Sequence, residues 1–315
     1  MSRKQDFLDV VQRKIPERVP LWELHFHLWS VLSNGQFVSG KAFAALTAHQ
    51  KREAIAKNAE VMADWGERLG FAAVSIPDTP WDCVYTLEPH WRIELIRQLK
   101  QLNPSFYVVG GCCGLIGMPT SSHGYEEFCY HLFDEPEAVD TECAAGYESF
   151  KVEADRLADA GIDGLYFAAD IADNRAPFFN SEQIQRWYFP YLRKHAEYAK
   201  AKGLFALLHT DGNIETLLGD IRTSGVQILQ AIDPVAGMDI AKTKRALQGE
   251  VAVCGNFDCG LMITGTPQQV YDSAKHIVLS CKDGGGFVFG NTNAVDITTP
   301  VENYMAMLEA WNAFG

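Results

Sequence analysis

Imidazole, carboxylate, thiol and amide side chains recur at one kind of position in this sequence, directly after short apolar runs. The clearest pair is His209 and Asp211, which are separated by a single residue at the end of the run 204–209. Such a pair can bind a divalent metal ion or move a proton to or from a reacting group. The residues at these positions are Glu23, His25, His27, Asp78, Cys112, Cys113, Asp170, Asp173, His209, Asp211, Asp233, Asn256, Asp258, Asn291 and Asn293. Because apolar runs that repeatedly end in polar groups are costly for stability alone, this recurrence indicates a functional site.

Eight apolar runs alternate with longer segments of helical period. Most runs are continuous rather than alternating, as in parallel strands that are covered on both faces. The runs are 18–26, 71–77, 105–111, 163–170, 204–209, 226–233, 251–256 and 286–291. We therefore predict a single (β/α)8 barrel, or TIM barrel, over 1–315, with 1–17 as an N-terminal helical extension. A doubly wound open sheet is the alternative. In a barrel the carboxyl ends of all strands meet at one rim, which would bring the polar residues together.

Helix boundaries are marked in several places. An apolar stripe at helical spacing predicts a helix over 181–202. Thr266 before Pro267, and Thr299 before Pro300, each predict a helix that starts with a threonine cap and a proline in its first turn.

Composition narrows the class of protein. The net charge of −13 argues against nucleic acid and anionic membranes, since both need a basic surface. No apolar run approaches the roughly 18 residues of a membrane-spanning helix, and the N-terminal segment carries no export signal. The eight cysteines show no CxxC spacing, so we expect them to be reduced. These features predict a cytoplasmic protein.

Each candidate also has a plain structural interpretation. His209 and Asp211 could cap the segment that follows them, and Asp170 or Asp173 could cap the helix over 181–202. His25 and His27 share one face of a strand, where a ligand role and a buried imidazole role are equally consistent with the pattern. Cys112, Cys113 and Cys259 are better explained as small packing residues than as a redox pair or ligands.

Several longer motifs resemble those of one known family, the uroporphyrinogen decarboxylase (URO-D) superfamily. The resemblance covers nearly the whole chain after residue 15, and the motifs occur in the family's order. It implies a TIM barrel, but it does not imply a single activity, because the superfamily contains both tetrapyrrole decarboxylases and corrinoid-dependent methyltransferases. The motifs are GGCCGLIGMPTSSHGYEEFCYHLFDEPEAV (110–139), GIDGLYFAADIADNRAPFFNSEQIQRWYFPYLRKHAEYAKAKG (161–203), LLHTDGNIETLL (207–218), GMDIAKTKRALQGEVAVCGNFDCGLMITGTPQQV (237–270) and GGGFVFGNTNAVDITTPVEN (284–303).

The decarboxylase branch is the poorer match. Its members carry an arginine-rich RQAGR-type loop after the first strand and a GHG-type turn after the last. Here residues 22–32 contain no arginine, and the last motif has GNTNAV. Among the candidate residues at the barrel mouth, only Arg175 could bind a carboxylate. Uroporphyrinogen has eight carboxylates, which need a cationic site.

The methyltransferase branch typically binds zinc through a His-x-Cys motif and a second cysteine. This sequence has His209-Thr210-Asp211 at the first position and Asn291 or Asn293 at the second, so both thiolates are missing. A related group that cleaves aryl ethers uses carboxylates with a histidine. The resemblance therefore implies Zn2+ on His209 and Asp211, with the third ligand left open.

The resulting hypothesis is a methyltransferase that moves a methyl group from a small methylated donor, such as a methoxyaromatic, to Co(I) of a corrinoid protein. The cobalamin would be carried by that partner. The expected catalytic residues are His209, Asp211 and Asp170. The expected substrate contacts are Glu23, His25, His27, Asp78, Asp173, Arg175, Asn256, Asn291 and Asn293.

Two alternatives remain: a decarboxylase of a substrate smaller than uroporphyrinogen, and a non-catalytic ligand-binding protein. Aromatic residues near the expected mouth favour a flat apolar ligand over a polyanion. The methyl donor and the oligomeric state stay open, a homodimer included. The aromatic residues are Trp22, Phe26, Trp29, Trp81, Tyr85, Phe178, Phe179 and Phe257.

Overall fold

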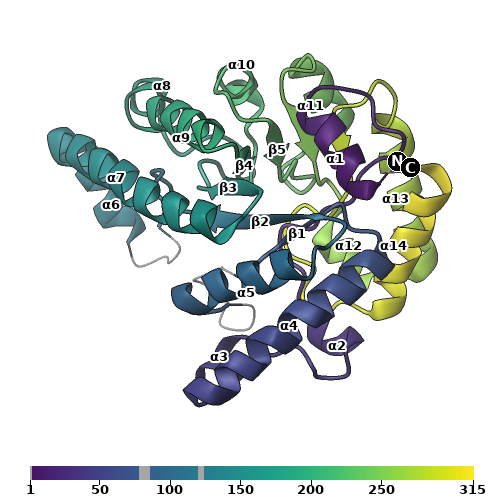
Figure 1. The fold of residues 1–315 in the computed structure, drawn as a ribbon. Coiled ribbons are helices and arrows are strands. Elements are labelled where there is room, and N and C mark those ends of the chain that lie inside the picture. The colour runs from purple at the N-terminus through teal and green to yellow at the C-terminus, as the bar shows by residue number, and fades with distance from the viewer. Residues whose placement is uncertain (1, 78–85, 120–123) are drawn as a thin grey trace.

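The computed structural model describes residues 2–77, 86–119 and 124–315. Its centre is a curled sheet of seven parallel strands, paired in chain order from β1 to β7 (Figure 1). The strands are β1 Ala73–Ser75, β2 Tyr107–Cys112, β3 Gly164–Ala168, β4 Phe205–His209, β5 Ile228–Gln230, β6 Ala252–Cys254 and β7 Phe287–Val288. A doubly wound sheet reverses its strand order at a switch point. The sequential order observed here excludes that alternative and is consistent with a TIM-barrel-like fold.

The first apolar run, 18–26, does not form the predicted eighth strand. Leu21 instead makes isolated parallel bridges, one to Phe71 and one to Phe289. It therefore lies between the segment that precedes β1 and the segment that follows β7. Pro20 accounts for part of this difference, because proline has no N–H group to donate to a ladder. The eight-stranded prediction is confirmed only in part.

Helices surround the sheet in Figure 1, where the strands run through the middle of the molecule. Most connect one strand to the next. They are α1 Arg3–Val11, α2 Trp29–Leu32, α3 Gly40–Ala44, α4 Ala48–Leu69, α5 Pro89–Gln101, α6 Tyr125–Asp134, α7 Pro136–Ala160, α8 Ser181–Gln183, the π-helix η1 Ile184–Tyr188, α9 Phe189–Ala201, the 3-10 turn η2 Glu215–Leu217, α10 Leu218–Arg222, α11 Ile240–Ala246, α12 Cys259–Thr264, α13 Pro267–Cys281 and α14 Val301–Phe314.

One of the two predicted helix starts is confirmed. Thr266 caps α13 and forms a capping box with Gln269. The other prediction is wrong by one residue, since Pro300 is the N-cap of α14. Thr299 does not cap, because its hydroxyl is buried and accepts no hydrogen bond among the described residues.

The segment predicted as one helix over 181–202 is helical, but it contains the π-turn η1. Pro190 follows directly in α9, lacks an N–H group, and its ring conflicts with the carbonyl four residues earlier. A wider π-turn at this point accommodates the missing hydrogen bond.

The sheet is buried on both faces, which explains the continuous apolar runs. Along β4, Ala206 and Leu208 pack in the larger hydrophobic cluster, while Leu207 packs in a second cluster with Phe7 of α1. Both faces thus exclude water, and polar side chains are left to the strand ends. None of the described helices is long and apolar enough to cross a membrane.

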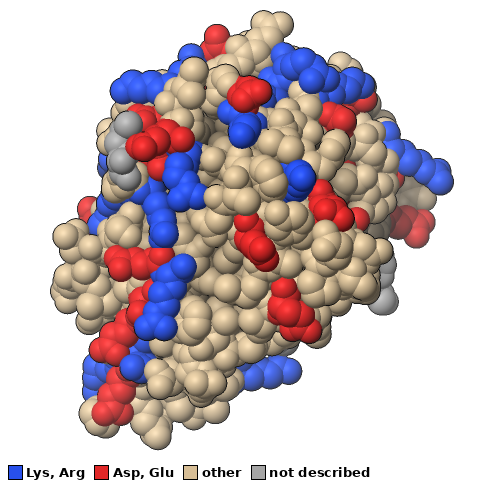
Figure 2. Space-filling view, turned by 90° about the vertical axis from the view of Figure 1, so that its right-hand side faces the viewer, with Lys and Arg blue, Asp and Glu red and all other residues tan. Residues whose placement is uncertain are grey.

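The molecular face that includes α13 and α14 carries acidic and basic side chains that are interspersed among broad uncharged areas (Figure 2). The net negative charge of the sequence does not gather there into a field of one sign. This face therefore offers no focused electrostatic attraction to a highly charged partner.

Candidate active site at the carboxyl ends of the strands

His209, Asp211 and Asp170 converge at the carboxyl ends of β3 and β4. The His209 Nε2 lies 3.8 Å from Asp211 Oδ2 and 4.0 Å from Asp170 Oδ1. One ligand-type atom from each residue lies within 4.8 Å of the other two. The three residues predicted to be catalytic are thus placed together, although their roles stay a prediction.

The loops that follow β3 and β4 are fastened to each other. The Asp211 N–H donates to Asp170 Oδ1 at 3.1 Å, and the Ile171 N–H donates to the Thr210 hydroxyl at 3.3 Å. Gly212 has φ +87, and a Cβ placed there would lie 2.4 Å from the carbonyl oxygen of Ala172. Only glycine allows this close approach of the two backbones.

The Asp211 carboxylate is partly buried and incompletely satisfied. Its Oδ2 accepts a 2.7 Å hydrogen bond from the side-chain amide of Asn293. Its Oδ1 is buried and has no hydrogen-bond partner among the described residues. Burial raises the pKa of Asp211, and nearby Asp170 and Asp233 raise it further, while His209 and the bond from Asn293 oppose the shift. This carboxyl group is therefore more readily protonated than an ordinary aspartate.

His209 is held from behind by Gln230, the last residue of β5. Its Nδ1 lies 2.5 Å from Gln230 Oε1. The Gln230 side-chain amide donates in turn to the backbone carbonyls of Asn291 at 3.1 Å and Thr292 at 2.8 Å. His209 is 6% exposed, so its ring is fixed by packing as well as by this bond.

A cavity of about 560 Å³ opens in front of this cluster. His209, Asp211 and Asp170 contribute to one part of its lining, together with His25 and Asn293. The described lining contains no Lys or Arg side chain. Its wall also includes the apolar or aromatic side chains of Leu115, Met118, Pro119, Tyr125 and Phe178. The cavity thus combines an acid and imidazole cluster with a largely apolar wall.

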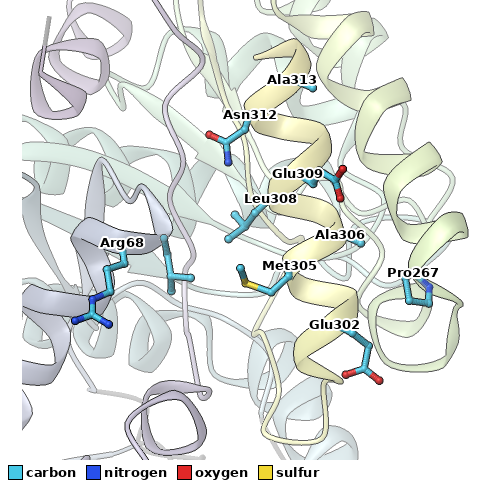
Figure 3. A pocket seen from close by; sticks show the side chains of 10 residues that line it. Arg68, Pro267, Glu302, Met305, Ala306, Leu308, Glu309, Asn312 and Ala313 are labelled. Atoms are coloured by element: carbon cyan, nitrogen blue, oxygen red, sulfur yellow. The ribbon is translucent and has the colours of Figure 1, made fainter.

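A larger hollow, of about 780 Å³, lies beside α14 and is shown in Figure 3. Met305 of α14 points toward Arg68 of α4, and Glu302 at the start of α14 and Glu309 also line the hollow. The described residues that line it include no imidazole or thiol. Since no nucleophile or acid–base pair converges there, we place the chemistry at the His209 cluster instead.

Glu23 and Asn291, both predicted as substrate contacts, lie outside the described lining of the cavity and bind each other. Glu23 accepts hydrogen bonds from the Asn291 N–H at 2.8 Å, from the Asn291 side-chain amide at 3.3 Å and from the Tyr304 hydroxyl at 3.2 Å. Burial raises the pKa of Glu23 to about 7 against the lowering effect of these bonds. The pair connects the first apolar run to the segment after β7.

Of the two adjacent histidines, only His25 lines the cavity. Burial, with His209 and His27 nearby, lowers the pKa of His25 to about 3, so this imidazole is neutral at ordinary pH. His27 is buried away from the described lining, and its Nδ1 lies 4.0 Å from Asp296 Oδ2.

Asp173, Arg175 and Asn256 are absent from the described lining of the cavity. Asp173 Oδ1 accepts hydrogen bonds from the backbone N–H groups of Arg175 and Ala176 at 2.7 and 3.0 Å, and Arg175 is exposed. The Asn256 amide donates to the Ile232 carbonyl at 2.6 Å, which supports a backbone with φ +79. Asp78 lies outside the described residues.

The structure places the other candidates as follows. Cys112 is buried against the Phe150 carbonyl, whereas Cys113 is exposed and lines the cavity. Burial raises the pKa of Cys259 to about 12, which disfavours a thiolate. Of the predicted aromatic residues, only Phe178 lines the cavity, while Trp22, Phe26, Trp29, Phe179 and Phe257 are buried and Trp81 and Tyr85 fall outside the described residues.

Gln230 and the apolar wall formed by Leu115, Met118 and Tyr125 were not predicted from the sequence. Gln230 carried a usable signal, because it is one of two glutamines inside the mainly apolar run 226–233. A buried amide requires partners, which itself points to a hydrogen-bond network. The wall residues carried no such signal.

The cluster fits a zinc ion in the chemistry of its donors. One imidazole nitrogen and carboxylate oxygens are accepted zinc ligands, and a catalytic site needs three protein ligands with one position left open. The buried Asp211 Oδ1, which has no described hydrogen-bond partner, is an acceptor that a cation would satisfy. His209 and Asp211 would hold the metal, with Asp170 as the third ligand.

Comparisons with known proteins agree with this fold. The model of the uroporphyrinogen decarboxylase (URO-D) family matches residues 85–314. A uroporphyrinogen decarboxylase from Anaeromyxobacter dehalogenans (strain 2CP-C) is 25% identical over 251 residues, which are 79% of this chain and 69% of that protein. One from Coxiella burnetii (strain RSA 493 / Nine Mile phase I) is 33% identical over 76 residues, 24% of this chain and 21% of that protein. Among solved structures, a methyltransferase from Methanosarcina mazei aligns with a TM-score of 0.77 and 16% identity, covering 100% of this chain and 99% of the other.

Proposed function

The chain belongs to the uroporphyrinogen decarboxylase family, and within it we propose that the protein is a methyltransferase that takes a methyl group from a small methoxyaromatic donor. The acceptor would be Co(I) in the cobalamin of a partner corrinoid protein. One observation carries the proposal: the His209, Asp211 and Asp170 cluster lies beside an apolar and aromatic wall, with no Lys or Arg side chain in the described lining. The methyltransferase from Methanosarcina mazei, which shares the fold over its full length, supports it.

The reaction defines what the site must supply. Methyl transfer breaks the CH3–O bond and forms a CH3–Co bond, so cobalt passes from Co(I) to Co(III). The electron pair of the broken bond stays on oxygen, which must be stabilised or protonated as it leaves. Because Co(I) is already a strong nucleophile, the enzyme's task is to activate the leaving group.

The chain's own residues suit this task. Where no metal is bound, Asp211, whose pKa is raised by burial, can deliver a proton to the departing oxygen. A zinc ion bound to His209, Asp211 and Asp170 would supply Lewis acidity for the same oxygen. Asn293 orients Asp211, and the wall that includes Met118, Pro119 and Phe178 suits an aromatic ring.

A decarboxylase of a smaller acid is the second candidate, because the named relatives of detectable identity are uroporphyrinogen decarboxylases. A decarboxylase of uroporphyrinogen itself is disfavoured, since eight carboxylates require a cationic cavity. Arg175, the only arginine among the predicted contacts, does not line this one. We expect no coproporphyrinogen when the enzyme is incubated with uroporphyrinogen and the products are separated by chromatography.

The test mixes the enzyme anaerobically with a methoxyphenol and free cob(I)alamin, and follows the conversion of Co(I) absorption to that of methyl-Co(III). His209→Ala and Asp211→Ala should each slow the reaction by at least about 100-fold, the usual effect of losing a metal ligand or a general acid. His276→Ala, on the exposed side of α13, is the matched control and should retain the rate. Near wild-type rates in both site variants would show that these residues are not catalytic. No transfer from any methoxyaromatic would favour the small-acid decarboxylase or a ligand-binding protein.

A further inference from the structure

His209 and Gln230 are register partners on the neighbouring strands β4 and β5, and both are the last residues of their strands. Gln230 is 1% exposed and does not line the cavity in the described structure. Its Oε1 contacts the His209 ring on the side away from Asp170 and Asp211, because it meets Nδ1 while Nε2 faces the carboxylates. The two ring nitrogens therefore have different environments.

The orientation of the Gln230 amide is fixed by its other contacts. Its Nε2 donates to two backbone carbonyls, those of Asn291 and Thr292. A carbonyl oxygen can only accept a hydrogen bond, so a flipped amide would place Oε1 against two further oxygens. Oε1 must therefore be the atom that faces His209. Because Oε1 has no hydrogen to give, the shared hydrogen belongs to His209 Nδ1.

We propose that Gln230 is a positioning residue that, in the neutral form of His209, places the ring hydrogen on Nδ1 and so directs the lone pair of Nε2 toward Asp170 and Asp211. The role of His209 in the reaction rests on the proposed function, whereas its tautomer does not. A neutral imidazole of this form can ligate a metal ion or accept a proton through Nε2. In this form Nε2 carries no proton that it could donate.

The alternative is that Gln230 only ties β5 to the segment after β7. A purely structural role predicts lower stability in a variant, with no change in the His209 tautomer. The two roles can be separated because they use different atoms: Nε2 makes the structural bonds, and Oε1 faces the histidine.

The experiment uses full-length protein labelled with 15N-histidine and freed of metal with a chelator. The 15N shifts of His209, assigned with His209→Ala, report its tautomer at pH 8. Wild type should show hydrogen on Nδ1. Gln230→Leu should lose this preference and lower the affinity for Zn2+, measured by competition with a chromophoric chelator, by about 10- to 100-fold.

Gln227→Leu is the matched control. Gln227 precedes the same strand, and its Oε1 accepts from the Ala206 N–H group at 3.0 Å, far along the strand from His209. This variant should keep both the tautomer and the zinc affinity of wild type. If Gln230→Leu does not fold, Gln230→Glu keeps an acceptor beside Nδ1 but loses both donated bonds. It should retain the Nδ1–H tautomer, which a structural role alone would not predict.

Hydrogen on Nε2 in wild type would overturn the inference, as would an unchanged tautomer and zinc affinity in Gln230→Leu. If the tautomer depends on Gln230 but no methyl transfer is found, the inference stands and the proposed function fails. The two outcomes are distinguishable because neither the tautomer nor the zinc affinity is read from activity.

Discussion

The side-chain amide of Asn293 donates a 2.7 Å hydrogen bond to Oδ2 of Asp211, across 82 residues of sequence. This bond joins the segment after β7 to the end of β4. It is made to a carboxylate whose other oxygen is buried without a described partner. The orientation of Asp211 therefore depends on a residue from the far end of the chain.

We predict that Asn293→Leu lowers kcat/KM for methyl transfer by about 10- to 100-fold, because a hydrogen bond to a charged group contributes about 1.5–3 kcal/mol. Steady-state kinetics with cob(I)alamin and a methoxyphenol give the ratio. Asn312→Leu, which alters an amide beside Arg18 instead, is the control. An unchanged kcat/KM in Asn293→Leu would show that this bond does not orient a catalytic group.

Metal content gives a second prediction. Protein expressed with added zinc should retain about one Zn2+ per chain, and His209→Ala should abolish retention, because two remaining protein ligands are too few. Elemental analysis after gel filtration measures the ratio, with His276→Ala as the control for loss of an exposed imidazole. A zinc-free wild type would leave His209 and Asp211 as proton-transfer groups only.

Gly212 and Gly237 provide a matched pair for the close contact between the loops after β3 and β4. Both have positive φ, but a Cβ at Gly212 would collide with the Ala172 carbonyl, whereas a Cβ at Gly237 meets nothing within 4 Å. Gly237→Ala should cost about 1–2 kcal/mol of unfolding free energy for backbone strain alone. Gly212→Ala should cost about 1–3 kcal/mol more, because one of the loops must move.

Denaturant unfolding of the two glycine variants measures this difference, and the zinc content of Gly212→Ala reports whether Asp170 and Asp211 separate. Equal stability losses in the two variants would mean that the loops adapt without strain.

Glu23 predicts a specific pH dependence of stability. Its pKa is raised from 4.5 to about 7 by burial, so folding favours the protonated form. The stabilising contribution is complete below about pH 4.5 and is lost as the pH rises through 7, by on the order of 3 kcal/mol. His25 has the opposite effect on stability. Its pKa is lowered from 6.5 to about 3, so its contribution to the unfolding free energy is lost as the pH falls below 6.5.

Comparison with Glu23→Gln isolates the effect of this one carboxyl, because His25 is common to both proteins. The unfolding free energy of the variant, relative to wild type, should rise steadily between pH 5 and pH 8, as measured by urea denaturation. A difference that does not vary with pH would show that Glu23 titrates at its ordinary pKa in the folded protein.

The sequence by itself determined the strand positions and the order of the sheet to a large degree. Continuous apolar runs can only be buried on both faces, and this requirement is local to each run. The cap at Thr266 was equally local, since it uses atoms three residues apart. The pairing of His209 with Asp211 followed from one short segment, which explains why it was found without knowledge of the fold.

The tertiary structure alone decided which polar residues share the cavity. Glu23 and His25 differ by two positions and would face the same side of a strand, yet only His25 lines the cavity. Their alternation fails because the run 18–26 contributes bridges rather than a strand, so its side chains do not follow a period of two.

The hydrogen-bond partners of Gln230 also could not be predicted from the sequence. Its run revealed a polar residue that needed partners, but those partners are carbonyls 61 and 62 residues away. Asn291 and Asn293 likewise separate, one toward Glu23 and the other toward Asp211. A hydrogen bond requires a donor–acceptor distance defined to within a fraction of an ångström and a favourable angle. For these residues, both are set only when the curled sheet brings distant strand ends together.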